Sequence, residues 1–398
     1  MGLTGKGNKY VLKEATKFVI LLGVVSLFAD MTYEGARSIT GPYLSILGAS
    51  GTVVGIVAGL GELVGYGLRL ISGYISDRTG KYWAITLFGY VMNLFAVPLL
   101  ALAGRLDIAI LLIIAERIGK GIRTPARDAM LSHATAQMGR GWGFGIHEAL
   151  DQIGAILGPL TVAAVLYFEG SYQVSFATLL VPAILALSVL ARARFLYPRP
   201  RIFEEDNAKL QSKGFPKAFW LYLAAVALIA AGFVDFSLIA FHFKEAIVVS
   251  DDWIPIFYAV AMGVDALAAL LFGRLFDRVG MPTLIAATVI SLFCVPLVFL
   301  GNFYFALLGV ALWGVGMGAQ ESIMRATIAG IVSIEKRGSA YGIFNTGWGI
   351  SWFLGSALMG FLYDVSVPAL IIFSVAAQLA SIPLFLLIRK RFLSAPSQ

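Results

Sequence analysis

The sequence predicts an all-helical integral membrane protein with twelve transmembrane helices. Of its 398 residues, 59% are hydrophobic and 13% are charged, and the mean hydropathy is +0.84. A helix needs roughly 20 apolar residues to cross a bilayer. Segments of that kind fill most of the chain, and the strand-like alternation of a membrane β-barrel is missing from the sequence. No stretch is left over for a soluble domain.

The predicted transmembrane segments follow one another with short polar connections. They start near Phe18, Gly51, Tyr82, Ile108, Gly141, Tyr172, Phe219, Trp253, Pro282, Phe303, Gly338 and Ala369. The first segment differs from a signal peptide because its apolar run is too long, contains Asp30 and Glu34, and has no small-residue cleavage site. We therefore expect it to be retained as the first helix.

Basic residues collect in alternate connections of the chain. They are Lys6, Lys9, Lys13, Lys17, Arg78, Lys81, Arg140, Arg192, Arg194, Arg199, Arg201, Lys209, Lys213, Lys217, Arg274, Arg278, Lys336, Arg337, Arg389, Lys390 and Arg391. The opposite connections hold mainly Arg105 and Lys244. By the positive-inside rule this asymmetry predicts that both termini are cytoplasmic. The net charge of +7 is thus explained by topology, and nucleic acid is not an expected partner.

Enzymatic and cofactor chemistry has no support in the sequence. It contains no nucleophile–base motif, no G-x4-G-K-[ST] phosphate loop and no HExxH pattern. Its one cysteine, Cys294, lies in an apolar run, so a disulfide or cysteine metal framework is excluded. A metal site at His147, Glu148 and Asp151 would need further ligands from other helices. We expect neither an enzyme, nor a cofactor, nor a resident metal.

Charged residues lie inside the apolar segments, mainly between Ile114 and Pro159. Glu116, Lys120, Arg123 and Arg127 recur every three or four residues, so they share a helical face. A second stripe contains His147, Asp151, Gly154 and Gly158, and a third contains Asp30, Glu34 and Arg37. A single charge facing lipid costs about 2.5–3.5 kcal/mol or more. These side chains are therefore expected to face a wet protein interior.

The second half of the chain repeats features of the first. The pattern G-x3-D-R-x-G starts at Gly73 and at Gly273, R-G-x2-aromatic-G-I starts at Arg140 and at Arg337, and Asp30 corresponds to Asp235. The polar interval 197–216 separates the halves. We predict a six-helix bundle at 1–196, a cytoplasmic linker at 197–216 and a second six-helix bundle at 217–398, with the bundles related by a pseudo-twofold axis.

These motifs resemble those of the major facilitator superfamily over essentially the whole chain. Gly73, Asp77, Arg78, Gly80 and Lys81 match the loop 2–3 signature of that family, with a weaker copy that includes Asp277 and Arg278. Arg117 with Gly121 matches the signature of the fourth helix. Gly154, Gly158 and Pro159 match the G-x3-G-P signature of the fifth, which the family associates with antiporters. The motif E-R-x-G-K-G-I-R-T-P-A-R-D of the fourth segment resembles that of a prokaryotic subgroup whose cargo is not defined.

The resemblance implies two gating elements. In the family the loop carboxylate, here Asp77, is held near the start of the eleventh helix, where Lys336 and Arg337 lie in this sequence. The alternative is that Arg78 and Lys81 only fix topology. Gly154, Gly158 and Pro159, which we call the glycine seam, predict close contact with a neighbouring helix. The seam either makes the protein exchange substrate for protons or serves helix packing alone. Its counterpart, Ser351, Gly355 and Ser356, lacks the proline.

The predicted proton-coupling residues lie on the first, fourth, fifth and seventh segments. They are Asp30, Glu34, Glu116, Arg117, His147, Glu148, Asp151 and Asp235. Counting about 1.5 Å per residue puts Asp30 and Arg117 at similar depths. A moving guanidinium could then switch the proton affinity of a buried carboxylate. Two alternatives remain open: a permanent Asp30–Arg117 ion pair, and a neutral core role for His147.

The predicted substrate-binding residues combine a charged wall with an aromatic wall. They are Arg37, Glu62, Lys120, Arg123, Arg127, Asp265, Glu321, Arg325, Phe344, Asn345, Trp348 and Trp352. Lys120, Arg123 and Arg127 either bind an anionic cargo group or neutralise Glu148, Asp151 and Asp128. The aromatic residues of the second half fit an amphiphilic cargo or serve packing.

The sequence thus predicts a secondary transporter that exports a small amphiphilic compound in exchange for protons. The alternatives are a proton symporter that imports an organic anion and a lipid-moving protein of the same fold; a sensor that binds ligand without flux is a further class. The expected partners are a small-molecule substrate, protons and the lipid bilayer. We expect a multi-pass monomer in the inner membrane of a prokaryote.

Overall fold

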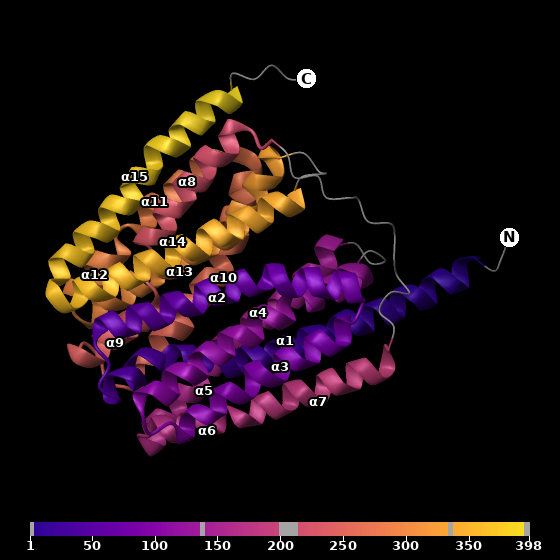
Figure 1. Cartoon of the computed structure of the whole chain (residues 1–398), viewed down its shortest axis with the longest axis horizontal. Helices are drawn as coiled ribbons and strands as arrows, with labels where there is room; N and C mark the ends of the chain where they lie inside the picture. Colours follow the sequence, from indigo (N-terminus) through magenta and orange to yellow (C-terminus); the bar gives the residue numbers. More distant parts are fainter. Residues whose placement is uncertain (1–3, 136–139, 199–213, 333–336, 394–398) are drawn as a thin grey trace. The chain divides into compact units, whose positions relative to one another are not determined.

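The computed structural model describes residues 4–135, 140–198, 214–332 and 337–393. Within these ranges the secondary structure is helical, with no strand. The first half contains α1 (Thr4–Ile46), α2 (Gly51–Thr79), α3 (Tyr82–Leu99) with the short η1 (Leu100–Leu102), α4 (Leu106–Thr135), α5 (Arg140–Glu169), α6 (Tyr172–Thr178) and α7 (Leu180–Leu196) (Figure 1). The second half contains α8 (Lys217–Gly232), α9 (Phe236–Glu245), α10 (Trp253–Val279), α11 (Met281–Ser291), α12 (Cys294–Leu300), α13 (Phe303–Ile331), α14 (Arg337–Val365) and α15 (Val367–Leu393).

These helices give twelve transmembrane segments. Three segments are built from two helices each, namely α6 with α7, α8 with α9, and α11 with α12. In the described residues, 10 segments are long and apolar enough to cross a membrane by composition alone. The segments of α4 and α14 are not among them. Charged residues lower the mean hydropathy of α4, and glycine, serine and asparagine lower that of α14. The predicted all-helical fold is confirmed.

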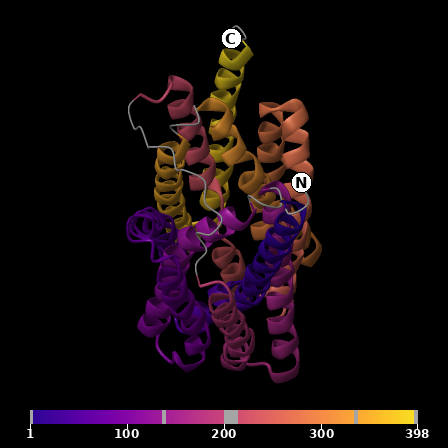
Figure 2. The same cartoon turned by 90° about the vertical axis from the view of Figure 1, so that its right-hand side faces the viewer.

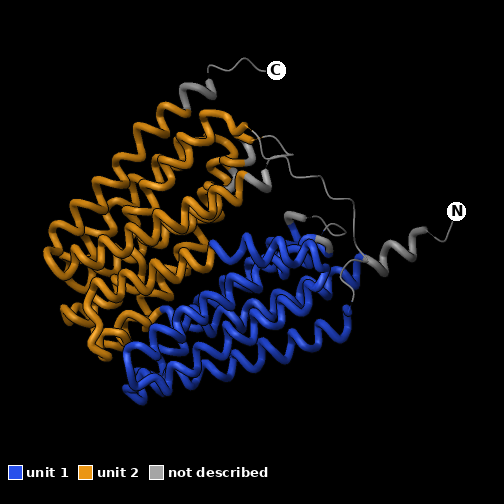
Figure 3. The backbone as a smooth tube through the Cα atoms, viewed as in Figure 1, with its two compact units in different colours: residues 1–37, 67–207 blue, residues 38–66, 208–398 orange. Residues whose placement is uncertain are grey.

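The chain forms two compact units, which Figure 3 colours separately. Unit 1 contains residues 1–37 and 67–207, and unit 2 contains residues 38–66 and 208–398. The helices α1 and α2 therefore each contribute to both units. The predicted division into 1–196, 197–216 and 217–398 stays a prediction, and most of the linker lies outside the described residues.

In unit 1 the helices run alongside one another (Figure 2). Their side chains form an apolar core between them. The core contains Phe18, Tyr90, Met130 and Leu190, from four different helices. The helix α5 packs closely on α1, because a Cβ atom at Gly154 would overlap the carbonyl oxygen of Leu27. Such contact is possible only where a residue lacks a side chain. This contact holds the polar faces of α1 and α5 against each other.

In unit 2 the seventh segment is broken between α8 and α9. Polar side chains from other helices bond the backbone groups that the break exposes. The carbonyl oxygen of Val234 accepts a hydrogen bond from Trp313 Nε1 (2.8 Å), and that of Gly232 accepts one from Gln378 Nε2 (3.1 Å). Asp235 then starts α9, since its Oδ1 accepts a hydrogen bond from the amide of Ser237 (2.8 Å). Irregular backbone in a membrane protein is stable only when its polar groups are satisfied in this way.

Candidate functional site

Eight polar side chains of α1, α4 and α5 gather inside unit 1, and we call them the buried charge cluster. They are Asp30, Tyr33, Glu34, Lys120, Arg123, Arg127, His147 and Asp151. The ionisable members that recur every three or four residues, Asp30 and Glu34 on α1, Lys120, Arg123 and Arg127 on α4, and His147 and Asp151 on α5, lie on one face of each helix, and Tyr33 is next to Glu34. Arg127 contacts Ser26 and Lys120 contacts Tyr33, so α1 and α4 run in opposite directions along this face. The cluster is the convergence of polar stripes that the sequence predicted.

The carboxyl groups of Asp30 on α1 and Asp151 on α5 lie beside each other and interact directly. Ionised carboxylates have acceptors only, so such a contact requires a proton on one of the two groups. Asp30 is 3% exposed, and the Oδ1 atom of each aspartate has no hydrogen-bond partner. In this structure Asp30 makes no ion pair with Arg117, in contrast to the alternative of a permanent pair. Two carboxyl groups placed together in a buried site are stable when they share one proton.

Lys120 is held by the neighbours of Asp30 on α1. Its Nζ lies 3.8 Å from Glu34 Oε1 and 3.8 Å from the centre of the Tyr33 ring. A cation over an aromatic face gains about 0.5–2 kcal/mol, more when it is desolvated. Lys120 is thus neutralised by Glu34, which the sequence analysis had not paired with it.

Arg127 connects α4 to α1 and α5. Its Nη2 lies 2.8 Å from Asp128 Oδ1, and its Nη1 donates a hydrogen bond to Ser26 Oγ (3.0 Å). Ser26 also lies near the carboxyl group of Asp151. Neutralisation by Asp128, one of the two expectations for this residue, is therefore present.

Arg123 is the exception among the cations of α4. Its side chain is 1% exposed, and neither Nε nor Nη1 has a hydrogen-bond partner among the described residues. Its contacts are aromatic, with Cζ 4.2 Å from the Tyr90 ring centre and 5.7 Å from that of Tyr33. A buried guanidinium without a carboxylate is costly. Its cationic charge is therefore available to another anion.

Glu116 and Arg117 form a separate polar group between α3 and α4. Asn93 Nδ2 donates to Glu116 Oε1 (2.7 Å), and Arg117 Nε lies 3.2 Å from Glu116 Oε2. The carboxylate of Glu116 is thus engaged on both oxygens. This arrangement joins the two helices, and the proton-coupling role predicted for the two residues stays a prediction.

The other residues predicted on the fifth segment, His147 and Glu148, differ in how far they are exposed. His147 is 4% exposed, its Nε2 has no hydrogen-bond partner, and it lies one turn before Asp151. Glu148 is exposed. Together with Asp151 they do not form a metal site: in the part of the chain that the structure describes, no group of three or more His, Cys, Asp or Glu side chains could hold a metal ion.

The glycine seam brings α5 against α1 at two points. Cβ atoms at Gly154 and Gly158 would overlap the carbonyl oxygens of Leu27 and Met31. The close helix contact predicted from the sequence is therefore present, and Pro159 lies inside the continuous α5. Whether the seam sets exchange stays a prediction.

The segment Gly73–Lys81, predicted as a loop, is instead the last turns of α2 together with the short connection at Gly80 and Lys81. Asp77 is exposed and accepts a hydrogen bond from Tyr82 Oη (3.2 Å), and Arg78 Nη1 donates to Tyr74 Oη (3.1 Å). Gly80 has a φ of 63°, a conformation that glycine adopts readily. The predicted partners of Asp77 fall on residue 336 and on the side chain of residue 337, which lie outside the described part of the structure.

In unit 2 the predicted aromatic residues form a ladder along α14. Phe344, Trp348 and Trp352 are buried, with ring centres 6.2 Å apart for the first pair and 5.5 Å apart for the second. The ladder continues to Phe233, 5.7 Å from Trp352. Trp352 Nε1 has no hydrogen-bond partner among the described residues. The rings thus form a continuous buried aromatic cluster.

The remaining polar and charged residues predicted for the substrate and gating roles differ in their exposure. Asp265 is 3% exposed, Asn345 and Glu62 are half-buried, and Glu321, Asp277 and Arg278 are exposed. The side chain of residue 325 lies outside the described part, and Arg37 is half-buried on α1. Asp235 caps α9, as described above, and its predicted coupling role stays a prediction.

Sequence reasoning missed four residues of this region: Ser26, Tyr33, Tyr90 and Asn93. Tyr33 and Tyr90 contact the cations of α4, and Asn93 bonds Glu116. A signal for Asn93 was present, because an amide inside an otherwise apolar helix usually bonds a polar group of a neighbouring helix. The tyrosines gave no such signal.

Comparison with known proteins identifies the family. The pattern of the Major Facilitator Superfamily matches residues 22–302 and, in a second match, residues 249–397. The chain belongs to the major facilitator superfamily. A protein of Mycobacterium tuberculosis is 43% identical to it over 382 residues, which cover 94% of this chain and 93% of that protein. The MFS-type transporter MJ1317 of Methanocaldococcus jannaschii is 27% identical over 369 residues, covering 89% of this chain and 90% of that protein.

A solved structure supports the same fold. The crystal structure of a bacterial homologue of the human lysosomal transporter Spinster, in an inward-facing and unoccupied conformation, matches this major facilitator protein with a TM-score of 0.76. The match covers 96% of this chain and 99% of the other, at 13% sequence identity. The protein is therefore a membrane transporter that moves a small molecule by alternating access.

Proposed function

We propose that this major facilitator protein is a proton-coupled antiporter that exports a small amphiphilic compound. The observation that carries the proposal is the contact between the carboxyl groups of Asp30 and Asp151. A shared proton between two buried acids can be gained or lost without breaking a covalent bond, and buried carboxyls in membrane transporters commonly form proton relays. The two aspartates are the proposed proton carrier.

The charges around the pair support this assignment. The charge of Lys120 is neutralised by Glu34, and that of Arg127 by Asp128. The charges of the cluster that remain to be balanced are those of Arg123 and the two aspartates. With one shared proton the pair carries one negative charge and balances Arg123. Gain or loss of a proton then leaves a net charge in a buried site, which is unfavourable unless cargo or a conformational change compensates it. This linkage is the proposed basis of coupling.

The aromatic ladder of α14 supports an amphiphilic cargo. Its phenylalanine and tryptophan rings lie in sequence along the helix, and such rings bind flat apolar groups well. Ligand sites are usually lined in this way, with a few polar groups that orient the ligand. We place the protein as a monomer in the cytoplasmic membrane of a prokaryote, with both termini cytoplasmic, on the basis of its basic connections.

Transport by purified protein in proteoliposomes tests the proposal. With ethidium as the probe and a pH gradient of either sign, wild-type protein is expected to move ethidium against the proton flow. Asp30→Asn and Asp151→Asn are expected to lose gradient-driven transport, while ethidium–ethidium exchange persists. The matched control is Asp107→Asn, which removes an exposed carboxylate paired with Arg105 and is expected to leave transport unchanged. Gradient-driven transport by both Asp30→Asn and Asp151→Asn would contradict the proposal.

A second candidate function is import of an organic anion together with protons. The unpaired Arg123 favours it, since a guanidinium presents a planar fork suited to carboxylate or phosphate. In the same proteoliposomes, radiolabelled salicylate serves as the probe. Uptake that follows the proton gradient inward and is abolished in Arg123→Gln supports symport. Ethidium export without salicylate uptake supports antiport.

A further inference from the structure

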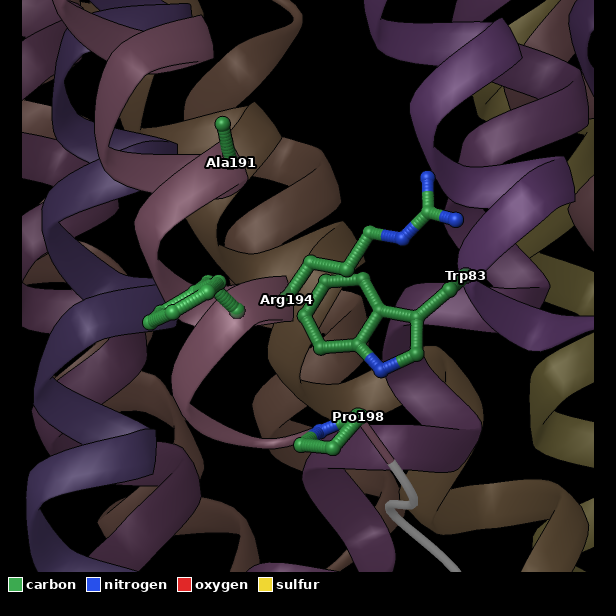
Figure 4. A pocket seen from close by; sticks show the side chains of 5 residues that line it. Trp83, Ala191, Arg194 and Pro198 are labelled. Carbon is green, nitrogen blue, oxygen red and sulfur yellow. The ribbon is translucent and has the colours of Figure 1, made fainter.

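A surface cavity lies at one end of unit 1, away from the buried charge cluster. Its volume is about 490 Å³, and it is lined by Trp83 of α3, by Ala191, Arg194 and Phe195 of α7, and by Pro198 (Figure 4). We call it the Trp83–Arg194 cavity. The transport function described above uses none of these residues, so the cavity needs its own explanation.

The position of the cavity along the helices places it at the boundary of the membrane. Trp83 is the second residue of the apolar span Tyr82–Leu102, and Arg194 and Phe195 are among the last residues of the span Tyr172–Leu196. Both spans therefore reach the membrane surface at the cavity. Tryptophan and arginine are enriched at that level, where headgroups meet acyl chains.

One wall of the cavity is fixed by packing. Trp83 is 7% exposed, and its Nε1 donates a hydrogen bond to the carbonyl oxygen of Tyr197 (2.9 Å). Its ring also packs edge to face on Phe18, at a centroid distance of 6.2 Å. The indole is thus held in one orientation before any ligand binds. A preformed wall reduces the ordering cost of binding.

The α7 side of the cavity carries the cation Arg194. Arg194 makes no hydrogen bond or ion pair with the described residues, and no carboxylate lines the cavity. Figure 4 shows the Arg194 side chain extending past the Trp83 indole. An apolar pocket with one guanidinium favours a ligand with an apolar body and an anionic group.

The face of α7 that continues from the cavity is apolar and exposed. Leu180 and Ile184 lie eleven and seven residues before Ala191, so they share its side of the helix. They are 37% and 49% exposed. A ligand whose anionic group sits in the cavity can therefore extend its apolar chains along this face into the hydrocarbon region.

We propose that the Trp83–Arg194 cavity binds the headgroup of an anionic glycerophospholipid. The phosphate pairs with the guanidinium of Arg194, the glycerol region packs on the Trp83 indole, and one acyl chain follows α7 past Ile184. Basic residues near a membrane surface attract anionic lipids, and basic pockets at the ends of transmembrane helices bind their headgroups. The site is independent of the proposed antiport.

Lipid binding to the delipidated full-length protein, measured by native mass spectrometry, tests the proposal. The probes are phosphatidylglycerol and phosphatidylcholine, at equal concentrations. Wild-type protein is expected to retain phosphatidylglycerol preferentially, and Arg194→Gln to bind it about fivefold more weakly, as follows from about 1 kcal/mol per basic residue near the surface. The matched control is Arg192→Gln, which removes an exposed arginine of the same helix that does not line the cavity. Equal losses in the two variants would overturn the proposal.

A second variant tests whether lipid binding needs the space of the cavity in addition to the charge of Arg194. Ala191→Phe keeps Arg194 but fills the space beside it, and Ala191 is exposed, so the fold is expected to tolerate the change. The variant is expected to bind phosphatidylglycerol more weakly than wild-type protein, as Arg194→Gln does. Unchanged binding would show that surface charge alone attracts the lipid, and would overturn the cavity assignment.

A third arm distinguishes a lipid from a free anion. The melting temperature of wild-type protein in detergent is expected to rise with phosphatidylglycerol and to stay constant with the same concentration of inorganic phosphate, because only the lipid contacts the α7 face. An equal rise with inorganic phosphate would assign the cavity to small anions and overturn the lipid proposal. Arg194→Gln is expected to abolish the rise.

Discussion

The guanidinium carbon of Arg123 lies 4.2 Å from the ring centre of Tyr90, and no carboxylate of the described residues pairs with it. A cation–π contact supplies about 2 kcal/mol when it is desolvated, whereas removing an ion from water costs several kcal/mol. The aromatic contact therefore does not account for the burial of this charge. A residue whose charge lowers stability in the resting structure is a candidate for a role elsewhere in the transport cycle.

Replacement of Arg123 by methionine is expected to separate stability from function. Methionine fills similar space without an unpaired charge, so we expect the melting temperature in detergent to stay constant or rise, while proteoliposome transport is lost. The control is Arg127→Met, which leaves Asp128 and Ser26 without their partner and is expected to lower the melting temperature. A fall for Arg123→Met as large as for Arg127→Met would show that Arg123 is structural.

The contact between α5 and α1 is expected to tolerate no added side chain. Gly158→Ala puts a Cβ atom onto the carbonyl oxygen of Met31, and overpacking of this kind typically costs about 1–3 kcal/mol. We expect a lower melting temperature and slower transport. The control is Gly145→Ala on the same helix, where an added Cβ meets nothing within 4 Å. Thermal unfolding of the two variants in detergent measures the difference, and equal melting temperatures would contradict the prediction.

The number of spans, the helical fold and the polar faces could all be predicted, because apolar length and the helical period are properties of the sequence itself. The convergence of Asp30, Lys120 and Asp151 followed from the cost of lipid-exposed charge. Close packing at Gly154 also followed, because glycines four residues apart permit backbone contact.

The pairing of individual side chains could not be predicted. The rise per residue gave the depth of Asp30 and Arg117, but depth does not give the rotation of a helix about its own axis. That rotation brings Asp151, rather than Arg117, to Asp30. The break after Gly232 was also missed, because no proline marks it. Asp235 offered a signal, since aspartate is a preferred residue at the start of a helix.

The break between α8 and α9 is expected to open when its side-chain donors are removed. Trp313→Phe keeps the ring but removes the donor to Val234, and a lost hydrogen bond of this kind costs about 1–3 kcal/mol when it leaves a buried acceptor unpaired. We expect faster amide hydrogen exchange at residues 233–239. The control is Trp253→Phe, whose ring is 40% exposed and packs on Phe303. Unchanged exchange in Trp313→Phe would mean that the other donors suffice.

The start of α2 is expected to depend on a carboxylate from the end of α14. Asp364 Oδ1 accepts a hydrogen bond from the amide of Gly51, and Oδ2 accepts bonds from the amide and the hydroxyl of Thr52, at 2.8, 2.8 and 2.6 Å. These amides would otherwise lack partners at the helix start, and the negative charge is favourable there. Loss of a comparable cap costs about 0.5–2 kcal/mol, so Asp364→Ala is expected to lower the melting temperature in detergent by a few degrees. Thr52→Val removes only the hydroxyl bond and is expected to have a smaller effect, whereas Asp107→Ala at an exposed ion pair is expected to have none. If Asp364→Ala and Asp107→Ala melt at the same temperature, the carboxylate does not stabilise α2.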